Sequence, residues 1–149
     1  MIKKSLIAAT LLTTVLIVPT TTFAEEAESV DKVQVTEASE LVMIPTGIGT
    51  RDSIKLNTTA TITTGAGFAS VQGSGKASKI MDSIYVKARV YSANGVLGDQ
   101  KSGTQNKTDY HSVKTYNAYV GWSNNYGFAN ATYKKAGYNT VSNEVRVNQ

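Results

Sequence analysis

The chain has 149 residues, of which 15 are basic and 11 acidic, for a net charge of +4; it holds one histidine and no cysteine. The lack of cysteine excludes disulfides and a thiol nucleophile, and one histidine leaves a zinc site without its usual ligands. A chain of this length is enough for one domain with a single core.

Residues 1–24 have the pattern of a cleaved signal peptide. Lys3 and Lys4 precede the apolar run 5–18, and small Thr22 and Ala24 occupy the positions that a signal peptidase reads. The alternative is an uncleaved membrane anchor, but the run is shorter than the roughly 18–20 residues that a span needs. We expect cleavage after Ala24 and a secreted, extracellular product. Export without cysteine, behind a threonine-rich signal, indicates a Gram-positive bacterium.

Residues 25–40 are predicted to form a flexible acidic leader, either a pro-segment or a linker, before a single domain at 41–149. Six acids and one lysine fall between residues 25 and 50, whereas twelve basic and five acidic residues follow from Arg51 onward. One interpretation is an ordinary solvated surface; the other is a basic domain that meets an anionic surface outside the cell, screened by the leader.

From residue 54 onward the hydrophobic period is two, as in half-buried strands. Stretches 54–62 and 84–91 alternate apolar and polar residues, and Asn94-Gly95 predicts a hairpin turn with a return strand over 96–104. The glycine-rich stretches 63–78 and 98–108 are expected to interrupt these strands. Residues 73–76 read GSGK but lack the upstream glycine and the following Ser or Thr of a phosphate-binding loop.

The C-terminal part predicts a last hairpin from 127–134 and 140–147. No stretch after residue 24 shows a sustained helical period. The fold class is therefore all-β: a small antiparallel β-sandwich. In style the last 65 residues or so are similar to immunoglobulin-like secreted modules, a resemblance without a fingerprint motif, from which no functional residue carries over.

Little catalytic chemistry is available. Asp109 lies two residues from His111, so a Ser-His-Asp triad is formally permitted, but no G-x-S-x-G elbow occurs and the acids are scattered. We expect no enzyme activity, metal or cofactor; a hydrolase with an unrecognised site is the weakest reading, and nucleic acid is not an expected partner.

The stretch YNAYVGWSNNYGF, residues 116–128, has two interpretations. Its aromatic residues either fill the core of a domain short of leucine and phenylalanine, which is the favoured reading, or form an exposed platform beside amide side chains. Tyr116, Ala118 and Val120 would share one face of a strand.

The sequence thus predicts a small secreted binding module for an anionic cell-wall polysaccharide or an extracellular protein. The alternative is an antimicrobial or membrane-active toxin that inserts residues 58–75 as a hairpin into anionic membranes. The predicted ligand-binding residues are Tyr119, Trp122, Asn124, Asn125, Tyr126, Lys87, Arg89, Lys134 and Lys135.

Overall fold

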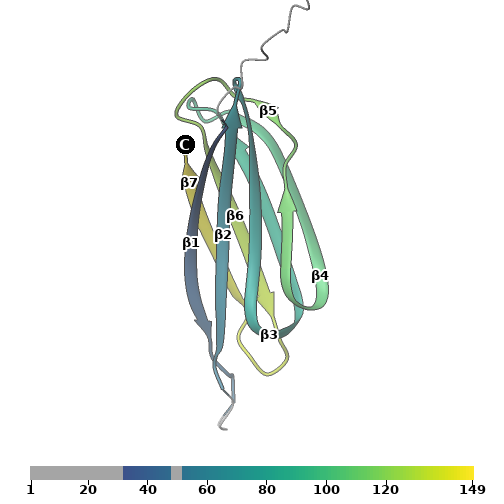
Figure 1. The fold of residues 1–149 in the computed structure, drawn as a ribbon. Helices are drawn as coiled ribbons and strands as arrows, with labels where there is room; N and C mark the ends of the chain where they lie inside the picture. Colours follow the sequence, from purple (N-terminus) through teal and green to yellow (C-terminus); the bar gives the residue numbers. More distant parts are fainter. Residues whose placement is uncertain (1–31, 48–51) are drawn as a thin grey trace, which may run out of the picture.

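The structure is a computed structural model that describes residues 32–47 and 52–149. These residues form an all-β, antiparallel fold without a helix (Figure 1). The predicted signal peptide, its cleavage site and leader residues 25–31 lie outside the described residues. The strands are β1 (Val33–Met43), β2 (Ile54–Gly65), β3 (Phe68–Tyr91), β4 (Leu97–Lys114), β5 (Ala118–Tyr119), β6 (Tyr126–Lys134) and β7 (Val141–Asn148).

The alternating sequence patterns form the strands that they predict. Along β2 every second residue from Ile54 to Thr64 is buried, and the same holds in β3 from Ile84 to Val90. The β3–β4 turn contains Asn94-Gly95, where Gly95 has φ +80° and donates to the carbonyl of Ser92. The C-terminal hairpin is β6 paired with β7. The all-β antiparallel prediction is confirmed.

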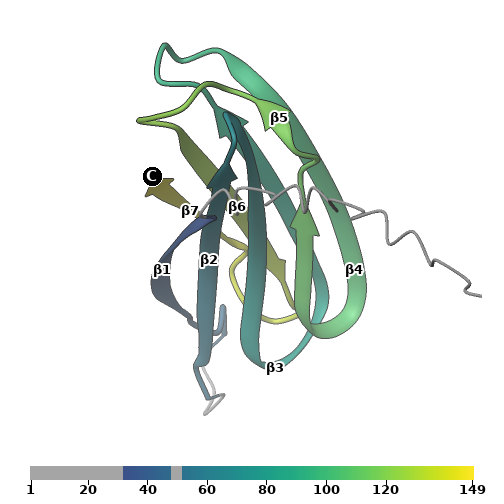
Figure 2. The same ribbon diagram turned by 45° about the horizontal axis from the view of Figure 1, so that its top comes forward.

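Strand β3 folds back over itself. Its first half pairs with β2 and its second half with β6, while β4 accompanies it along most of its length. A Cβ placed on Gly75 would lie 3.0 Å from Ile84 Cγ2, so the two halves of this strand face each other. The bend falls between Lys76 and Met81, where the β3–β4 register shifts. Figures 1 and 2 show β3 and β4 turning back at the same end of the molecule.

The outer strands of the sheet approach each other and nearly close it on itself. Strand order is β1-β2-β3-β6-β7, with β4 and β5 also paired to β3. At the seam between β1 and β7, Asn143 donates to the carbonyl of Ser39 at 3.4 Å. Below β1, Thr46 donates its amide to the carbonyl of Gly137 at 3.0 Å. The strands therefore form one curled sheet, and the predicted immunoglobulin-like sandwich is not confirmed.

Small side chains fill the middle of the core. Gly73, Gly75 and Gly127 point inward, and a Cβ on Gly73 would lie 2.9 Å from that of Ala129. Such spacing leaves no room for a larger residue at these positions. Larger apolar side chains pack around this centre, among them Met43, Ile54, Leu56, Ile62, Val71, Met81, Ile84, Val86, Val90 and Val147.

Tyr133 carries the largest fully buried side chain and links β6 to β2 across the core. Its hydroxyl donates to the carbonyl of Asn57 at 2.7 Å and shares a 3.0 Å hydrogen bond with the hydroxyl of Thr58. Burial raises the pKa of this phenol above its ordinary value, and the hydrogen bond to Thr58 offsets part of that rise.

Two parts of the chain that the sequence predicted to lie outside strands are found in strands. Residues 33–40, predicted to belong to a flexible leader before a domain starting near Leu41, form most of β1, which pairs with β2 from Val33–Thr64 to Met43–Ile54. Nearly all of its side chains are exposed or half-buried, so this edge strand shows no apolar alternation to find. The glycine-rich stretches 63–78 and 98–108 lie largely within strands, because several of their glycines sit where the folded halves approach closely.

Replacing Gly127 with alanine should destabilise the protein by about 1–3 kcal/mol, a cost typical of overpacking. The new methyl group would overlap Val71 Cγ2 and lie 2.9 Å from the carbonyl oxygen of Arg89. Gly47→Ala is the control, because its chain neighbours aside, no atom of the described residues lies within 4 Å of its Cβ position. Denaturant unfolding followed by circular dichroism measures both. Equal midpoints for Gly127→Ala and the unaltered protein would contradict the close approach of β3 and β6.

Tyr133→Phe should lower the free energy of unfolding by about 1–3 kcal/mol, since a buried carbonyl and a buried hydroxyl lose their partner.

The raised pKa of Tyr133 also predicts that the stability of the protein depends on pH. The neutral phenol is favoured in the folded state, so its stabilising contribution is complete below about pH 10 and is lost as pH rises through the folded-state pKa. Tyr133→Phe has no phenol to ionise here, so its stability should fall less at alkaline pH than that of the unaltered protein. Tyr85→Phe, on the half-buried outer face, should retain the full fall.

Candidate functional site

The structure separates the nine predicted site residues into different regions. Tyr119, Trp122 and Asn124 lie at the end of the molecule that carries β5, the β2–β3 turn and the end of β7 (Figures 1 and 2). Lys134 and Lys135 lie at the opposite end, where the β6–β7 turn is found. The remaining residues, Lys87, Arg89, Asn125 and Tyr126, fall on the outer face of the sheet or inside the fold.

Three exposed aromatic side chains gather around the β2–β3 turn. Phe68, Tyr119 and Trp122 are 45%, 69% and 70% exposed, and we call this group the aromatic tip. Phe68 and Tyr119 are cross-strand partners whose ring centroids lie 5.4 Å apart in an edge-to-face arrangement. The favoured sequence interpretation, a core role for residues 116–128, is therefore wrong for Tyr119 and Trp122. It is also wrong for Tyr116, which is 75% exposed.

The backbone of the turn brings these rings together. Ala66 and Gly67 both have positive φ, the geometry of a two-residue hairpin turn. The carbonyl of Gly67 accepts the amides of Val120 and Gly121 at 3.0 and 3.1 Å. A Cβ on Gly67 would lie 2.9 Å from the Tyr119 ring and 3.6 Å from the Trp122 ring. Glycine at this position therefore lets both rings approach the turn.

Asn125 fixes the loop that carries Trp122. It is only 1% exposed, and its Nδ2 donates to the carbonyl of Gly121 at 3.0 Å and to Gln149 Oε1 at 2.9 Å. Gln149 in turn donates its amide to the carbonyl of Asn125 at 2.9 Å. The Nδ2 of this predicted ligand-binding residue therefore holds the loop, while its buried Oδ1 has no hydrogen-bond partner among the described residues. Asn124 is exposed with φ +58° and makes the turn before it.

Two hollows share Phe68 in their lining. Among the described residues the first, about 210 Å³, is lined by no ionisable side chain, and we call it the neutral hollow. The second, about 200 Å³, is lined by two lysines and by no described carboxylate side chain, and we call it the lysine hollow. Gly65, Ala66 and Phe68 line both. The neutral hollow is completed by Val33, Thr64, Gly67, Gly121, Trp122 and Gln149, and the lysine hollow by Lys32, Thr63, Ser70, Lys114 and Asn117.

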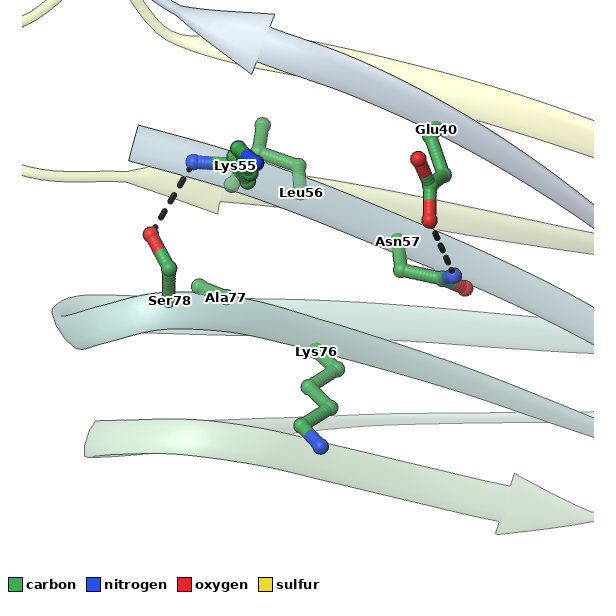
Figure 3. Close-up of a pocket in the computed structure, with 7 residues that line it drawn as sticks. All are labelled: Glu40, Lys55, Leu56, Asn57, Lys76, Ala77 and Ser78. Atoms are coloured by element: carbon green, nitrogen blue, oxygen red, sulfur yellow. Dashed lines mark hydrogen bonds between the residues drawn. The ribbon is translucent and has the colours of Figure 1, made fainter. Parts of the chain in front are cut away.

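A third hollow, about 250 Å³, lies where β2 and β3 separate (Figure 3). Its lining contains a carboxylate and two lysines but no aromatic ring. The amide of Lys55 donates to Ser78 Oγ at 3.0 Å, and Asn57 Nδ2 donates to Glu40 at 3.5 Å. Lys76 points away from this pair in Figure 3. Among the described residues this hollow therefore has two hydrogen bonds between its polar groups, no partner for either lysine ammonium group, and no aromatic ring on which a ligand could stack.

Arg89 and Tyr126 belong to a network of hydrogen bonds and cation–π contacts on the outer face of β3, β6 and β7. Arg89 Nη2 donates to Glu144 at 2.6 Å and to Asn130 Oδ1 at 2.7 Å. Arg146 lies over the Tyr126 ring at 4.6 Å from its centroid. These contacts tie three strands together, although the buried Nε of Arg89 has no hydrogen-bond partner among the described residues. None of them is with a residue of the aromatic tip. Lys87 is on the same outer face, and Lys135 donates to the carbonyl of Ile80 at 2.6 Å.

His111 lies where β4 folds back. Its Nδ1 is 3.2 Å from Gln105 Oε1, and its buried Nε2 has no hydrogen-bond partner among the described residues. Neither a serine hydroxyl nor Asp109 is hydrogen-bonded to this ring in residues 32–47 and 52–149. Over the same residues no group of three His, Asp or Glu side chains is placed to hold a metal ion. The GSGK stretch, 73–76, lies inside β3.

Sequence reasoning missed Phe68, Lys32, Lys114 and Gln149 as candidate site residues. Phe68 lies in the glycine-rich stretch 63–78, which was predicted only to interrupt the strands. Its exposure depends on the pairing of β3 with β5. The two lysines are 82 positions apart and meet only through the fold. A phenylalanine next to an Ala-Gly turn was the one local signal available.

The described part of the chain contains no helix long and apolar enough to cross a membrane. No protein-family model, curated protein or solved structure matches this chain.

Proposed function

We propose that this protein is a secreted, non-catalytic module that binds a cell-envelope polysaccharide through the aromatic tip. The observation that carries the proposal is the exposure of Phe68, Tyr119 and Trp122, which gather around the β2–β3 turn beside two hollows. Contiguous apolar surface that stays in contact with water is typical of an interaction site. Burying these rings against a ligand would recover the hydrophobic free energy that folding leaves unused.

Carbohydrate suits this surface because it combines apolar faces with many hydroxyl groups. Flat rings can pack against the apolar face of a sugar ring, while side-chain hydroxyls and amides bond to its hydroxyl groups. Thr64 and Gln149 supply such groups in the neutral hollow, and Thr63, Ser70 and Asn117 line the other. A purely apolar partner would leave these polar groups without water or hydrogen bonds.

The aromatic tip is held in place before any ligand arrives. Val120 and Gly121 are hydrogen-bonded to Gly67, and Asn125 clamps the following loop. A surface that is already ordered loses less conformational entropy on binding. This preorganisation supports binding as the role of the exposed rings.

The setting of this proposal comes from the sequence. Residues 1–24 carry the signal-peptide pattern, and the absence of cysteine fits export from a Gram-positive bacterium. The finer fold assignment, a small β-sandwich in the immunoglobulin-like style, belongs to the same proposal. Its support is that the two halves of β3 face each other across the core.

The second candidate is a membrane-active toxin, favoured by one observation: Val33 is exposed beside the aromatic rings, as in surfaces that enter lipid headgroups. Insertion of residues 58–75 as a hairpin would in addition expose Ala60, Ile62 and Val71, which are buried in the core. The aromatic tip would therefore be the first part to reach a bilayer under this alternative. An extracellular protein is the remaining candidate partner.

Trp122 is the only tryptophan, so its fluorescence tests the proposal directly. Emission of the free protein should be that of a solvated indole, and purified wall polysaccharide should shift it to the blue. Trp122→Ala should weaken polysaccharide binding, measured by calorimetry, by about tenfold or more, as expected for a central aromatic contact worth 1.4 kcal/mol or more.

Tyr116→Ala is the matched control, because Tyr116 is as exposed as Trp122 but does not line either hollow. It should leave binding unchanged. Equal losses in both variants would mean that the aromatic tip is not the site. Binding to phosphatidylglycerol vesicles with dye release, and none to polysaccharide, would replace the proposal with the toxin reading.

A further inference from the structure

We infer that the two hollows beside Phe68 form one bipartite site for an anionic polysaccharide, with an uncharged sugar at the aromatic tip and a carboxylate or phosphodiester at Lys32 and Lys114. This inference rests on the proposed function and adds the charge of the ligand and the residues that select it. Neither Lys32 nor Lys114 is among the ligand-binding residues predicted from the sequence.

The hollows are contiguous. Both are lined by Gly65, Ala66 and Phe68, so they adjoin at the β2–β3 turn and share one aromatic side chain. A ligand that stacks on the rings in the neutral hollow can therefore extend into the lysine hollow without leaving the surface. A polymer of repeating units suits this arrangement better than a single small molecule.

The lysine hollow has the charge and donors of an anion site. Lys32 precedes β1, whereas Lys114 ends β4, and neither takes part in a salt bridge among the described residues. The hydroxyl of Thr63 and the amide of Asn117 add donors, and none of the described residues that line the hollow is acidic. Two like charges at one hollow repel each other, and a bound anion would relieve that repulsion.

The neutral hollow, by contrast, favours an uncharged group. Its described lining has no ionisable side chain, so a carboxylate or phosphate placed there would lose hydration without gaining a counter-charge from it. The two halves of the site therefore differ in what they accept. This asymmetry predicts one orientation for a ligand whose charged and uncharged units alternate.

The test uses three probes: a polyuronic acid, the same polymer after chemical reduction of its carboxyl groups, and a wall teichoic acid, whose charges are phosphodiesters. The variant is Lys32→Gln with Lys114→Gln. The control is Lys55→Gln with Lys134→Gln, which removes the same charge from exposed positions outside both hollows. Calorimetry at low and high salt measures binding, and denaturant unfolding checks that the variants remain folded.

We expect the Lys32/Lys114 variant to bind at least one charged polymer about tenfold more weakly and to lose most of its salt dependence. Its affinity for the reduced, neutral polymer should equal that of the unaltered protein. The control pair should retain tight, salt-dependent binding. Loss for the polyuronic acid alone identifies a carboxylate as the ligand group, and loss for teichoic acid alone identifies a phosphodiester.

Equal losses in the control pair would overturn the inference, because the charge would then act through the whole surface. Unchanged binding in the Lys32/Lys114 variant would also overturn it. The proposed function fails by a different result, namely if Trp122→Ala binds the reduced polymer as tightly as the unaltered protein does. Tight binding to phosphatidylglycerol vesicles, with none to any polymer, would overturn both and assign the lysines to a lipid headgroup.

Discussion

The fold depends on the close approach of strand β3 to itself and to β6. This approach is possible only because glycine and alanine occupy the facing positions, above all Gly73, Gly75 and Gly127. The halves of β3 then exclude water without disulfides or a large aromatic core. In a cysteine-free domain this packing and the sheet hydrogen bonds have to provide the stability that small exported domains often obtain from disulfides.

The same constraint places the aromatic residues. A core with a glycine and alanine centre has little space for large rings, and among the described residues only Tyr133 is fully buried. The others lie on the outer face, at the ends of strands or in the loops between them. Some of these pack together, as Tyr126 and Phe128 do with the arginines. The aromatic tip is the group that remains most exposed, and it supplies the candidate site.

Much of the fold could be predicted from the sequence, because apolar and polar residues alternate with period two in β2, in the second half of β3, in β6 and in β7. β1 could not, since an edge strand exposed on both faces leaves no apolar pattern. The bend in β3 could not either: a glycine such as Gly75 reads locally as a break, whereas in the structure it allows contact with a residue beyond the bend.

The candidate site was predictable only in part. Tyr119 and Trp122 stand out within a short aromatic stretch, but their exposure is decided by Gly67, which belongs to another hairpin. Positive charge predicts Lys87 and Arg89 as binding residues, but charge alone does not reveal that Arg89 is already paired with Glu144. Lys32 and Lys114 come together through strand pairing that no local pattern encodes.

The clamp between Asn125 and Gln149 has a practical consequence for how the protein is handled. Gln149 bonds through its side chain and its backbone amide to the loop that carries Trp122, and it also lines the neutral hollow. A tag, dye or solid support joined to this residue would therefore crowd the ligand and loosen the ring that reports it. Attachment at the β6–β7 turn, at the far end of the molecule, would leave the aromatic tip facing solution (Figure 1).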